Sequence, residues 1–302
     1  MSTLDGGTAT ALASPALTVP PVTVTDGLVT IGPDAVRLRS ALDDVFTGWA
    51  RTAGAQSVLY SPLTRVADLA RFDYFVNFPH LALAATPVHT PDVDGATPLP
   101  HHPAPDDAHL SGGQLGSAGY LLPSAACYNA YLSLAGSRLD GPVKLTTIAQ
   151  CFRRETRYDG LRRLHGFTMR EIITVGGPDD AKAHLAEFKP LIEALSAHLG
   201  LGLRTEVATD PFFDPNGSRA VMQKLFPVKE EFVTADGVAI ASVNYHRNFF
   251  GDRADLHVNG EPAHTSCVAF GVERWLHALN ARFSGDWAAA VEAVRAFPVT
   301  AP

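Results

Sequence analysis

The stretch AQCFRRETRYDGLRRLHGFTMREIITV, residues 149–175, decides the fold of this chain. Two runs with an apolar pattern, Thr146 to Phe152 and Leu164 to Val175, flank a polar turn centred on Tyr158-Asp159-Gly160. Asp-Gly is a dipeptide typical of the turns that join paired antiparallel strands. The pattern therefore predicts a β-hairpin.

The predicted hairpin is rich in arginine, although the chain has a net charge of −7. Six arginines fall within eighteen residues: Arg153, Arg154, Arg157, Arg162, Arg163 and Arg170. The guanidinium group carries a rigid fork of donors that suits phosphate and carboxylate groups. A solvated charged surface is the alternative for an arbitrary run of arginines. We expect the hairpin to face a polyanionic ligand.

Composition limits the class of protein. With 302 residues and 46% hydrophobic residues, the chain can bury a substantial core as one large domain or two. No apolar run approaches the roughly eighteen residues of a membrane span, and no basic residue precedes Arg37, so a signal peptide is not expected. Three widely spaced cysteines form no disulfide framework. We therefore expect a cytoplasmic protein that does not bind membranes.

The two ends of the chain are expected to be poorly ordered. Met1 to Thr25 is rich in Ala, Thr, Ser and Pro and predicts a disordered tail. Residues 26–302 are assigned to one globular domain, of which the last dozen residues form a second disordered end. A long loop is expected from Ala85 to Gly119, which contains many Pro, Gly and His residues.

Helices and strands alternate unevenly along the globular part. Helical patterns run from Val36 to Ala53, with Asp34 as the expected N-cap, and from Pro178 to Gly200. Further strands are expected within Leu203–Ala208 and Ala239–Asn248, and Ser266–Phe270 leads into a helical pattern. Because strands outnumber crossover helices and hairpins join them, we predict an α+β fold with a mainly antiparallel sheet flanked by helices.

Two segments resemble signatures of one enzyme class. Phe152-Arg153-Arg154-Glu155, followed by Gly166-Phe167, resembles motif 2 of class II aminoacyl-tRNA synthetases. Gly271-Val272-Glu273-Arg274, which leads into a helical pattern, resembles motif 3. The helix from Val36 with the strand Ser57 to Pro62 can be read as motif 1. The resemblance implies the catalytic domain of that class, with its active site on the open face of the sheet, in a homodimer built through motif 1.

The resemblance also implies how ATP binds. Arg153 would hold the α-phosphate of ATP and the substrate carboxylate, and Glu155 would fix the adenine end or the loop. Adenine would lie between Phe167 and the guanidinium of Arg274, and Arg163 would complete the ATP site. Because a carboxylate nucleophile is already ionised at pH 7, Arg153, Arg274 and Mg²⁺ would act by positioning and charge neutralisation.

The cysteines allow two interpretations. Cys127 and Cys267 lie 140 residues apart, so their spacing alone is no zinc signal, and buried structural cysteines are the simpler alternative. One branch of seryl-tRNA synthetase relatives holds an active-site Zn²⁺ by Cys, Glu and Cys, and Cys127, Glu171 and Cys267 occupy those places. Three ligands leave a position for the substrate amino group. Cys151 is assigned to the core.

The acceptor is inferred from the same resemblance. Only 35 residues precede Val36, so we expect no tRNA-binding arm, and no anticodon domain is expected after motif 3. The chain is most similar to amino acid:carrier protein ligases, truncated seryl-tRNA synthetase homologues. That similarity implies that glycine or alanine is activated as an adenylate and passed to the phosphopantetheine thiol of a carrier protein. It also places Asn244 and His246 at the substrate, although Arg247-Asn248-Phe249 departs from the family pattern.

Alternatives stay open at this point. A class II-like enzyme could pass the adenylate to a natural-product intermediate or to a tRNA, although the acidic charge argues against a broad nucleic-acid surface. A silent paralogue could bind and regulate a partner, but it would have no reason to keep Phe152, Arg153, Glu155, Phe167 and Arg274 together. A carrier could dock on the loop 85–119 or on the helix 178–200.

Overall fold

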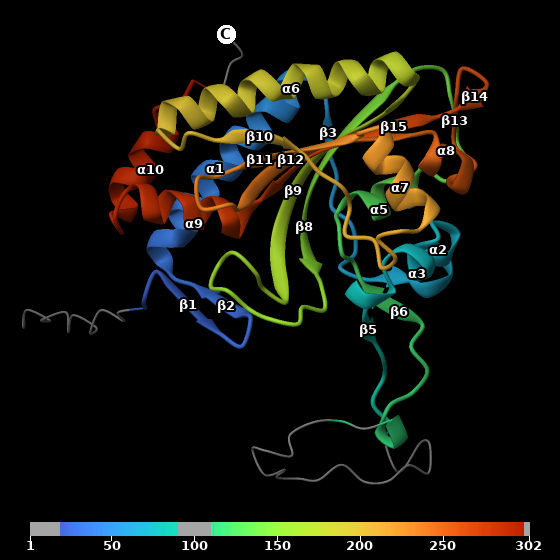
Figure 1. Cartoon of the computed structure of the whole chain (residues 1–302), viewed down its shortest axis with the longest axis horizontal. Helices are drawn as coiled ribbons and strands as arrows, with labels where there is room; N and C mark the ends of the chain where they lie inside the picture. Colours follow the sequence, from blue (N-terminus) through green and yellow to red (C-terminus); the bar gives the residue numbers. More distant parts are fainter. Residues whose placement is uncertain (1–18, 90–109, 111, 299–302) are drawn as a thin grey trace, which may run out of the picture.

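The computed structural model describes residues 19–89, 110 and 112–298. Its centre is a seven-stranded sheet in the order β10-β11-β12-β15-β9-β8-β3 (Figure 1). The strands are β3 Gln56–Ser57, β8 Val143–Phe152, β9 Gly166–Gly176, β10 Arg204–Val207, β11 Lys229–Val233, β12 Ala239–Arg247 and β15 His264–Gly271. Every pair is antiparallel except β3 with β8. The expected α+β fold with a mainly antiparallel sheet is confirmed.

Three small sheets surround the large one. Strands β1 Val22–Thr25 and β2 Leu28–Ile31 form a two-stranded sheet. The second sheet has the order β4 Thr64–Arg65, β6 Tyr120–Leu122 and β5 Leu83–Ala85, and the third has the order β14 Glu261–Pro262, β13 His257–Val258 and β7 Arg138–Leu139.

Helices cover one face of the seven-stranded sheet. Helices α1 Pro33–Thr52, α6 Pro178–Leu199, α9 Val272–Arg282 and α10 Trp287–Arg295 gather on this side (Figure 1). The shorter helices are α2 Val66–Arg71, α3 Tyr74–Asn77, α5 Cys127–Ser133, α7 Ser218–Leu225 and α8 Phe249–Ala254, with 3-10 turns at Pro79–Leu81 and Gly112–Gln114. None of the described helices combines the length and the hydropathy that a membrane crossing requires.

The main core lies between these four helices and the sheet. Because side chains alternate between the two faces of a strand, Ile172, Val268 and Phe270 all enter this core. Phe270 stacks on Phe46 of α1, with their ring centroids 4.0 Å apart. The residues next to them in sequence point to the opposite face, which the four long helices leave uncovered.

The central hairpin is confirmed. Strands β8 and β9 pair without a register shift from Val143 opposite Val175 to Phe152 opposite Gly166. The loop between them, residues 153–165, turns at Asp159, whose backbone bonds to Arg163 from both sides. The predicted helix ending at Gly200 is also confirmed as α6.

Four expectations are wrong in part. Val22–Thr25, expected to be disordered, forms β1, because its valines pack against the main core. The last dozen residues include the second half of α10, where Val291 and Val294 are buried. Helix α1 begins at Pro33 after Gly32, so Asp34 lies inside the helix and is no N-cap. Residues 1–18 and most of the loop expected within 85–119 lie outside the described residues.

The fourth expectation that is wrong concerns Arg170. It was counted among the arginines that face a ligand, but its side chain is 6% exposed and lies on the helix-covered face. There its Nε and Nη2 atoms donate to the two carboxylate oxygens of Asp43 on α1, both at 2.8 Å. The reason is strand alternation: Arg170 neighbours Glu171 in β9, so the two side chains leave opposite faces.

Candidate active site

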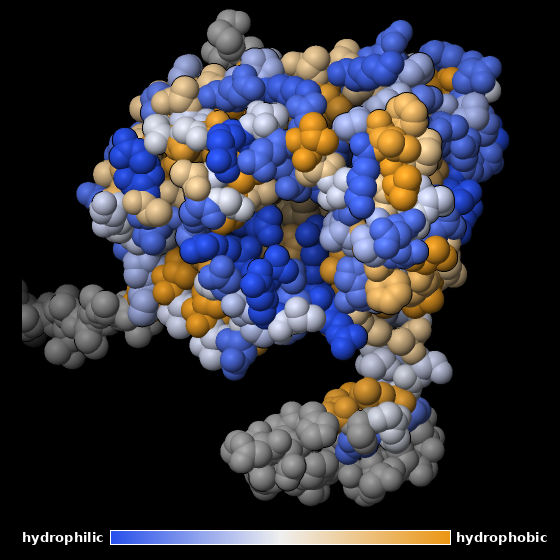
Figure 2. Space-filling view, in the orientation of Figure 1, coloured by the Kyte–Doolittle hydropathy of each residue, from blue (hydrophilic) through white to orange (hydrophobic). Residues whose placement is uncertain are grey.

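A cavity of about 500 Å³ opens on the uncovered face of the large sheet. Figure 2 shows this face hollowed, with hydrophilic residues gathered in and around the recess. All the residues that the sequence assigned to a site line this cavity: Cys127, Arg153, Glu155, Arg163, Phe167, Glu171, Asn244, His246, Cys267 and Arg274. Cavities of this size are typical of small-molecule sites.

The pairing of the strands puts three of these residues, Asn244, Cys267 and Glu171, in two rows across the sheet. One row runs through the Cα partners Lys229, Asn244 and Cys267. The adjacent row runs through Glu231, Ser242, Ala269 and Glu171. Strand register therefore brings together chemistry that is spread over more than ninety residues of sequence.

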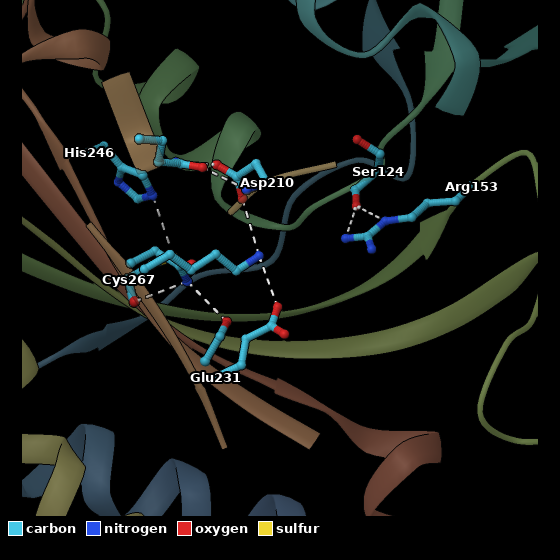
Figure 3. A network of polar contacts seen from close by, with 10 residues as sticks. Ser124, Arg153, Asp210, Glu231, His246 and Cys267 are labelled. Carbon is cyan, nitrogen blue, oxygen red and sulfur yellow. Dashed lines mark hydrogen bonds and ion pairs between the residues drawn. The ribbon is translucent and has the colours of Figure 1, made fainter. Parts of the chain in front are cut away.

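Arg153 lies at the arginine-rich end of the cavity. Its Nε and Nη2 atoms both donate to the carbonyl oxygen of Ser124, at 3.2 Å (Figure 3). Its guanidinium lies 5.1 Å from the centroid of the Phe167 ring. The cation that covers Phe167 is thus Arg153, whereas the sequence predicted a slot between Phe167 and Arg274. The stacking role of Arg274 stays a prediction.

Arg274 enters the same end from the first turn of α9. Its Nε donates to the carbonyl of Arg162 and its Nη1 to the carbonyl of Ala239, both at 3.0 Å. Burial lowers the pKa of Arg274, and the nearby positive charge of Arg153 lowers it further. Two guanidinium groups that line the same cavity and repel each other favour an anionic ligand there.

Two carboxylates hold the loop and the helix that carry these arginines. Glu273 is buried, and its Oε2 accepts a hydrogen bond of 2.7 Å from the backbone N–H of Thr168 in β9. Glu155 accepts a bond of 2.7 Å from Nη1 of Arg163 across the loop 153–165. The geometry supports the loop-fixing alternative for Glu155, and its contact with adenine stays a prediction.

The opposite end of the cavity holds Cys127, Glu171 and Cys267. One donor atom from each lies within 4.8 Å of the others, and all three residues are buried. Glu171 Oε1 accepts from the backbone N–H of Ala126 at 3.0 Å, whereas Oε2 is buried without a hydrogen-bond partner. Burial raises the pKa of Glu171. Two thiols and an unpaired buried carboxylate oxygen fit a Zn²⁺ ion.

Asn244 and His246 lie beside this group. Asn244 Nδ2 is 3.4 Å from Cys267 Sγ, and His246 Nε2 is 3.8 Å from the same sulfur. The other ring nitrogen of His246 contacts the Thr265 hydroxyl at 3.1 Å. Burial lowers the pKa of His246 to about 4, so its imidazole is neutral at pH 7. The structure brings both residues to the site, and their contact with substrate stays a prediction.

Sequence reasoning missed a second charged group in the cavity. Lys229 Nζ lies 3.1 Å from both Asp210 Oδ1 and Glu231 Oε1 (Figure 3). Burial opposes the charge on Lys229, but the Asp210 and Glu231 carboxylates outweigh burial and raise its pKa. Lys229 and Glu231 stand two apart on a strand, which was a usable signal for one shared face. Asp210 lies in an irregular segment and gave none.

The part of the chain that holds this site is similar to known proteins. Residues 123–283, which hold all ten residues of the predicted site, match the tRNA synthetase class II core domain (G, H, P, S and T). The chain belongs to the class II aminoacyl-tRNA synthetase family. This family membership agrees with the resemblance drawn from Arg153 and Arg274.

Three relatives are similar to this chain in sequence. Amino acid–[acyl-carrier-protein] ligase 1 of Bradyrhizobium diazoefficiens is 35% identical over 234 residues, covering 74% of this chain and 70% of that protein. Ligase 2 of the same organism is 34% identical over 236 residues, covering 74% and 69%. A type-2 serine–tRNA ligase of Methanococcus aeolicus is 27% identical over 191 residues, covering 57% and 36%.

Solved structures show the same fold. The seryl-tRNA synthetase of M. kandleri, solved with A. aeolicus tRNASec, superposes with a TM-score of 0.72 at 20% identity, covering 87% of this chain and 55% of that one. Prolyl-tRNA synthetase of Cryptosporidium parvum superposes with a TM-score of 0.63 at 14% identity, covering 88% and 50%. The chain thus spans about half the length of these synthetases.

Proposed function

We propose that the protein is a ligase that activates a small amino acid with ATP and transfers it to the phosphopantetheine thiol of a carrier protein. The observation that carries this proposal is one cavity with two unlike ends. Arg153, Arg163 and Arg274 line the end suited to ATP, and the Cys127–Glu171–Cys267 group lines the other.

The first step is adenylate formation. A carboxylate oxygen of the amino acid attacks the α-phosphorus of ATP, the bond from that phosphorus to the oxygen shared with the β-phosphate breaks, and pyrophosphate leaves. Mg²⁺ would neutralise charge on the phosphates. Arg153 and Arg274 neutralise charge that grows on the α-phosphate, so their positioning lowers the barrier. No general base is needed, because the attacking carboxylate is ionised at pH 7.

The second step releases AMP. The thiolate of the carrier's arm attacks the carbonyl carbon of the adenylate, a thioester forms, and the carboxyl–phosphate bond breaks. The two relatives named as amino acid–[acyl-carrier-protein] ligases support this acceptor. The net charge of −7 also disfavours attraction to an RNA backbone.

Cys127, Glu171 and Cys267 are proposed to hold Zn²⁺. When bound, the ion supplies a Lewis-acidic anchor for the amino group of the substrate. Asn244 orients Cys267 by its contact with the sulfur. Glycine or alanine is the favoured substrate, as the family resemblance implies, and the charged Lys229 beside Asn244 supports a substrate with little apolar bulk.

We also propose a homodimer in a reducing cytoplasm. Strand β3 is one of the two edges of the large sheet among the described residues, and Leu59, just after it, is 79% exposed. An exposed strand edge is a ready surface for pairing with a second copy. All three cysteines are free thiols. Sedimentation velocity is expected to give twice the mass of the chain, and a monomer at micromolar concentration contradicts this proposal.

ATP–pyrophosphate exchange tests the first step. We expect exchange with glycine or alanine and not with large apolar amino acids. The second step is tested by offering labelled amino acid, ATP, total tRNA and a phosphopantetheinylated carrier side by side. Label is expected on the carrier as a thioester that hydroxylamine cleaves. Label on tRNA alone would reverse the choice of acceptor, and no exchange with any amino acid would contradict the whole proposal.

Elemental analysis tests the metal site. Protein purified without chelator is expected to contain one zinc per chain, and Cys267→Ser is expected to lose both the zinc and amino-acid-dependent exchange. Cys151→Ser is the matched control, since Cys151 is equally buried but does not belong to the group. Zinc-free wild-type protein with full exchange would return Cys127 and Cys267 to a structural role.

A further inference from the structure

The β1–β2 hairpin lies against the loop 153–165, which carries Arg153 and Arg163 of the ATP end. Figure 1 shows the hairpin beside the loop that joins β8 and β9. Its turn, Asp26-Gly27, contacts the loop. The proposed reaction does not involve residues of this hairpin, and its turn is far from the loop in sequence.

Gly27 packs closely against the loop. Its backbone has φ +75°, a left-handed conformation that disfavours residues with a side chain. The ring of Tyr158 covers it so closely that a Cβ atom added at Gly27 would overlap the ring, with Tyr158 Cγ only 2.8 Å away. The tip of the loop therefore rests on the backbone of the hairpin, with no room for a side chain between them.

Hydrogen bonds continue from this contact to the site. The backbone N–H of His165 donates to the carbonyl of Gly27 at 3.0 Å, and the carbonyl of His165 accepts from the N–H of Arg153 at 3.0 Å. The Tyr158 hydroxyl contacts His165 Nε2, which ties the tip of the loop to its base. Gly27 is thus two hydrogen bonds from Arg153.

The same loop supports the second arginine. The carbonyl of Arg162 accepts the bond from Arg274 Nε. Leu161 and Leu164 are buried in the main core, against which the hairpin residues Val24 and Val29 also pack. A shift of the hairpin would therefore be transmitted to the loop through backbone contacts and through the core.

We propose that the β1–β2 hairpin is a positioning element for the ATP-binding loop, and that the Gly27–Tyr158 contact sets the position of Arg153. The inference rests on the proposed function for its kinetic consequence, but the contact itself does not. Because the hairpin touches the loop and not the ligand, it acts on ATP binding through Arg153. Its loss should raise KM for ATP more than it lowers kcat at saturating ATP, because contacts with bound ATP would help to hold Arg153 in place.

The decisive variant is Gly27→Ala, and the matched control is Gly54→Ala. Gly54 has φ +78°, and an added Cβ meets nothing within 4 Å, so both variants carry the same backbone cost while only Gly27→Ala pushes against Tyr158. We expect kcat/KM for ATP in pyrophosphate exchange to fall about tenfold to a hundredfold in Gly27→Ala, mainly through KM. In Gly54→Ala it should stay at the wild-type value.

A double variant separates the contact from general damage. Tyr158→Ala removes the ring, so adding Gly27→Ala to it should cost little more, and the two effects should be strongly non-additive. Additive effects would show that Gly27→Ala acts on folding alone and would overturn the proposal. Equal KM values for ATP in Gly27→Ala and Gly54→Ala would overturn it as well.

Limited trypsin digestion gives a readout that does not depend on activity. The loop 153–165 offers arginines to trypsin, and mass spectrometry can follow cleavage after Arg157 in the intact chain. Cleavage is expected to be faster in Gly27→Ala than in Gly54→Ala. If wild-type protein catalyses no exchange, the proposed function fails, and this digestion still decides the role of the hairpin. Equal cleavage rates would overturn that role.

Discussion

The two faces of the seven-stranded sheet are built from the same strands and do different work. On the helix-covered face, Ile172, Val268 and Phe270 form the centre of the main core. On the open face, their sequence neighbours Glu171 and Cys267 line the cavity. In β9 and β15, residues of the main core thus alternate with residues of the opposite face, some of which line the cavity.

This difference between the faces predicts whether a substitution changes stability or reaction rate. A change on the covered face removes packing and should lower stability without altering chemistry in the molecules that stay folded. A change on the open face removes a polar group that lines the cavity, and it should lower the rate more than the stability. Measurements of stability and of rate on the same variants can test this separation.

The largest effect is expected on the covered face. Phe270→Ala removes a ring that stacks on Phe46, and it should lower the free energy of unfolding by about 4 kcal/mol. Denaturant unfolding measures the loss, and Phe270→Leu gives a milder variant if the alanine variant does not fold. Exchange activity per folded molecule should be unchanged. A lower rate in fully folded Phe270→Leu would break the separation of the faces.

The next effect is expected on the open face. Arg153→Ala should lower the exchange rate about a hundredfold, which corresponds to roughly 3 kcal/mol of lost transition-state stabilisation, and Arg274→Ala should do the same. Arg157→Ala, an exposed arginine of the same loop that does not line the cavity, is the control. The melting temperature of Arg153→Ala should equal that of wild type. Unchanged exchange in both cavity variants would remove the ATP end from the proposal.

The smallest effect is a pH dependence of stability on the covered face. His184 of α6 is buried and contacts the carbonyl of Ile172 at 3.1 Å, and burial lowers its pKa from 6.5 to about 4. As the pH falls below 6.5, His184 therefore takes up a proton in the unfolded chain but stays neutral in the folded chain. The free energy of unfolding should therefore fall by about 2 kcal/mol between pH 6.5 and 5. It should stop falling below the pKa that His184 has in the folded protein.

His184→Gln provides the comparison for this pH dependence. Glutamine keeps a donor for the Ile172 carbonyl but does not titrate, so its stability should fall less steeply from pH 6.5 to 5. Urea unfolding at several pH values measures both slopes. Identical slopes would mean that protonation of His184 is not what weakens the covered face in acid.

The sequence was sufficient for the parts of the molecule that local patterns encode. The β8–β9 hairpin followed from its turn and apolar runs, and all ten proposed site residues line one cavity. Arg170 was assigned to the wrong face, because charge was counted along the strand without its alternation. The partnership of Lys229 with Asp210 depends on where an irregular segment returns to the sheet, and no local pattern records that.

Strand β15 has a consequence for how the protein is made. It is the last strand of the large sheet in the chain, yet it lies between β12 and β9. During synthesis, β8 and β9 can pair early, but the centre of the sheet stays open until residue 271 has left the ribosome. Sheets closed by such distant pairings fold slowly. Incomplete chains therefore expose a vacant slot between two strand edges, which makes them targets for chaperones and for aggregation.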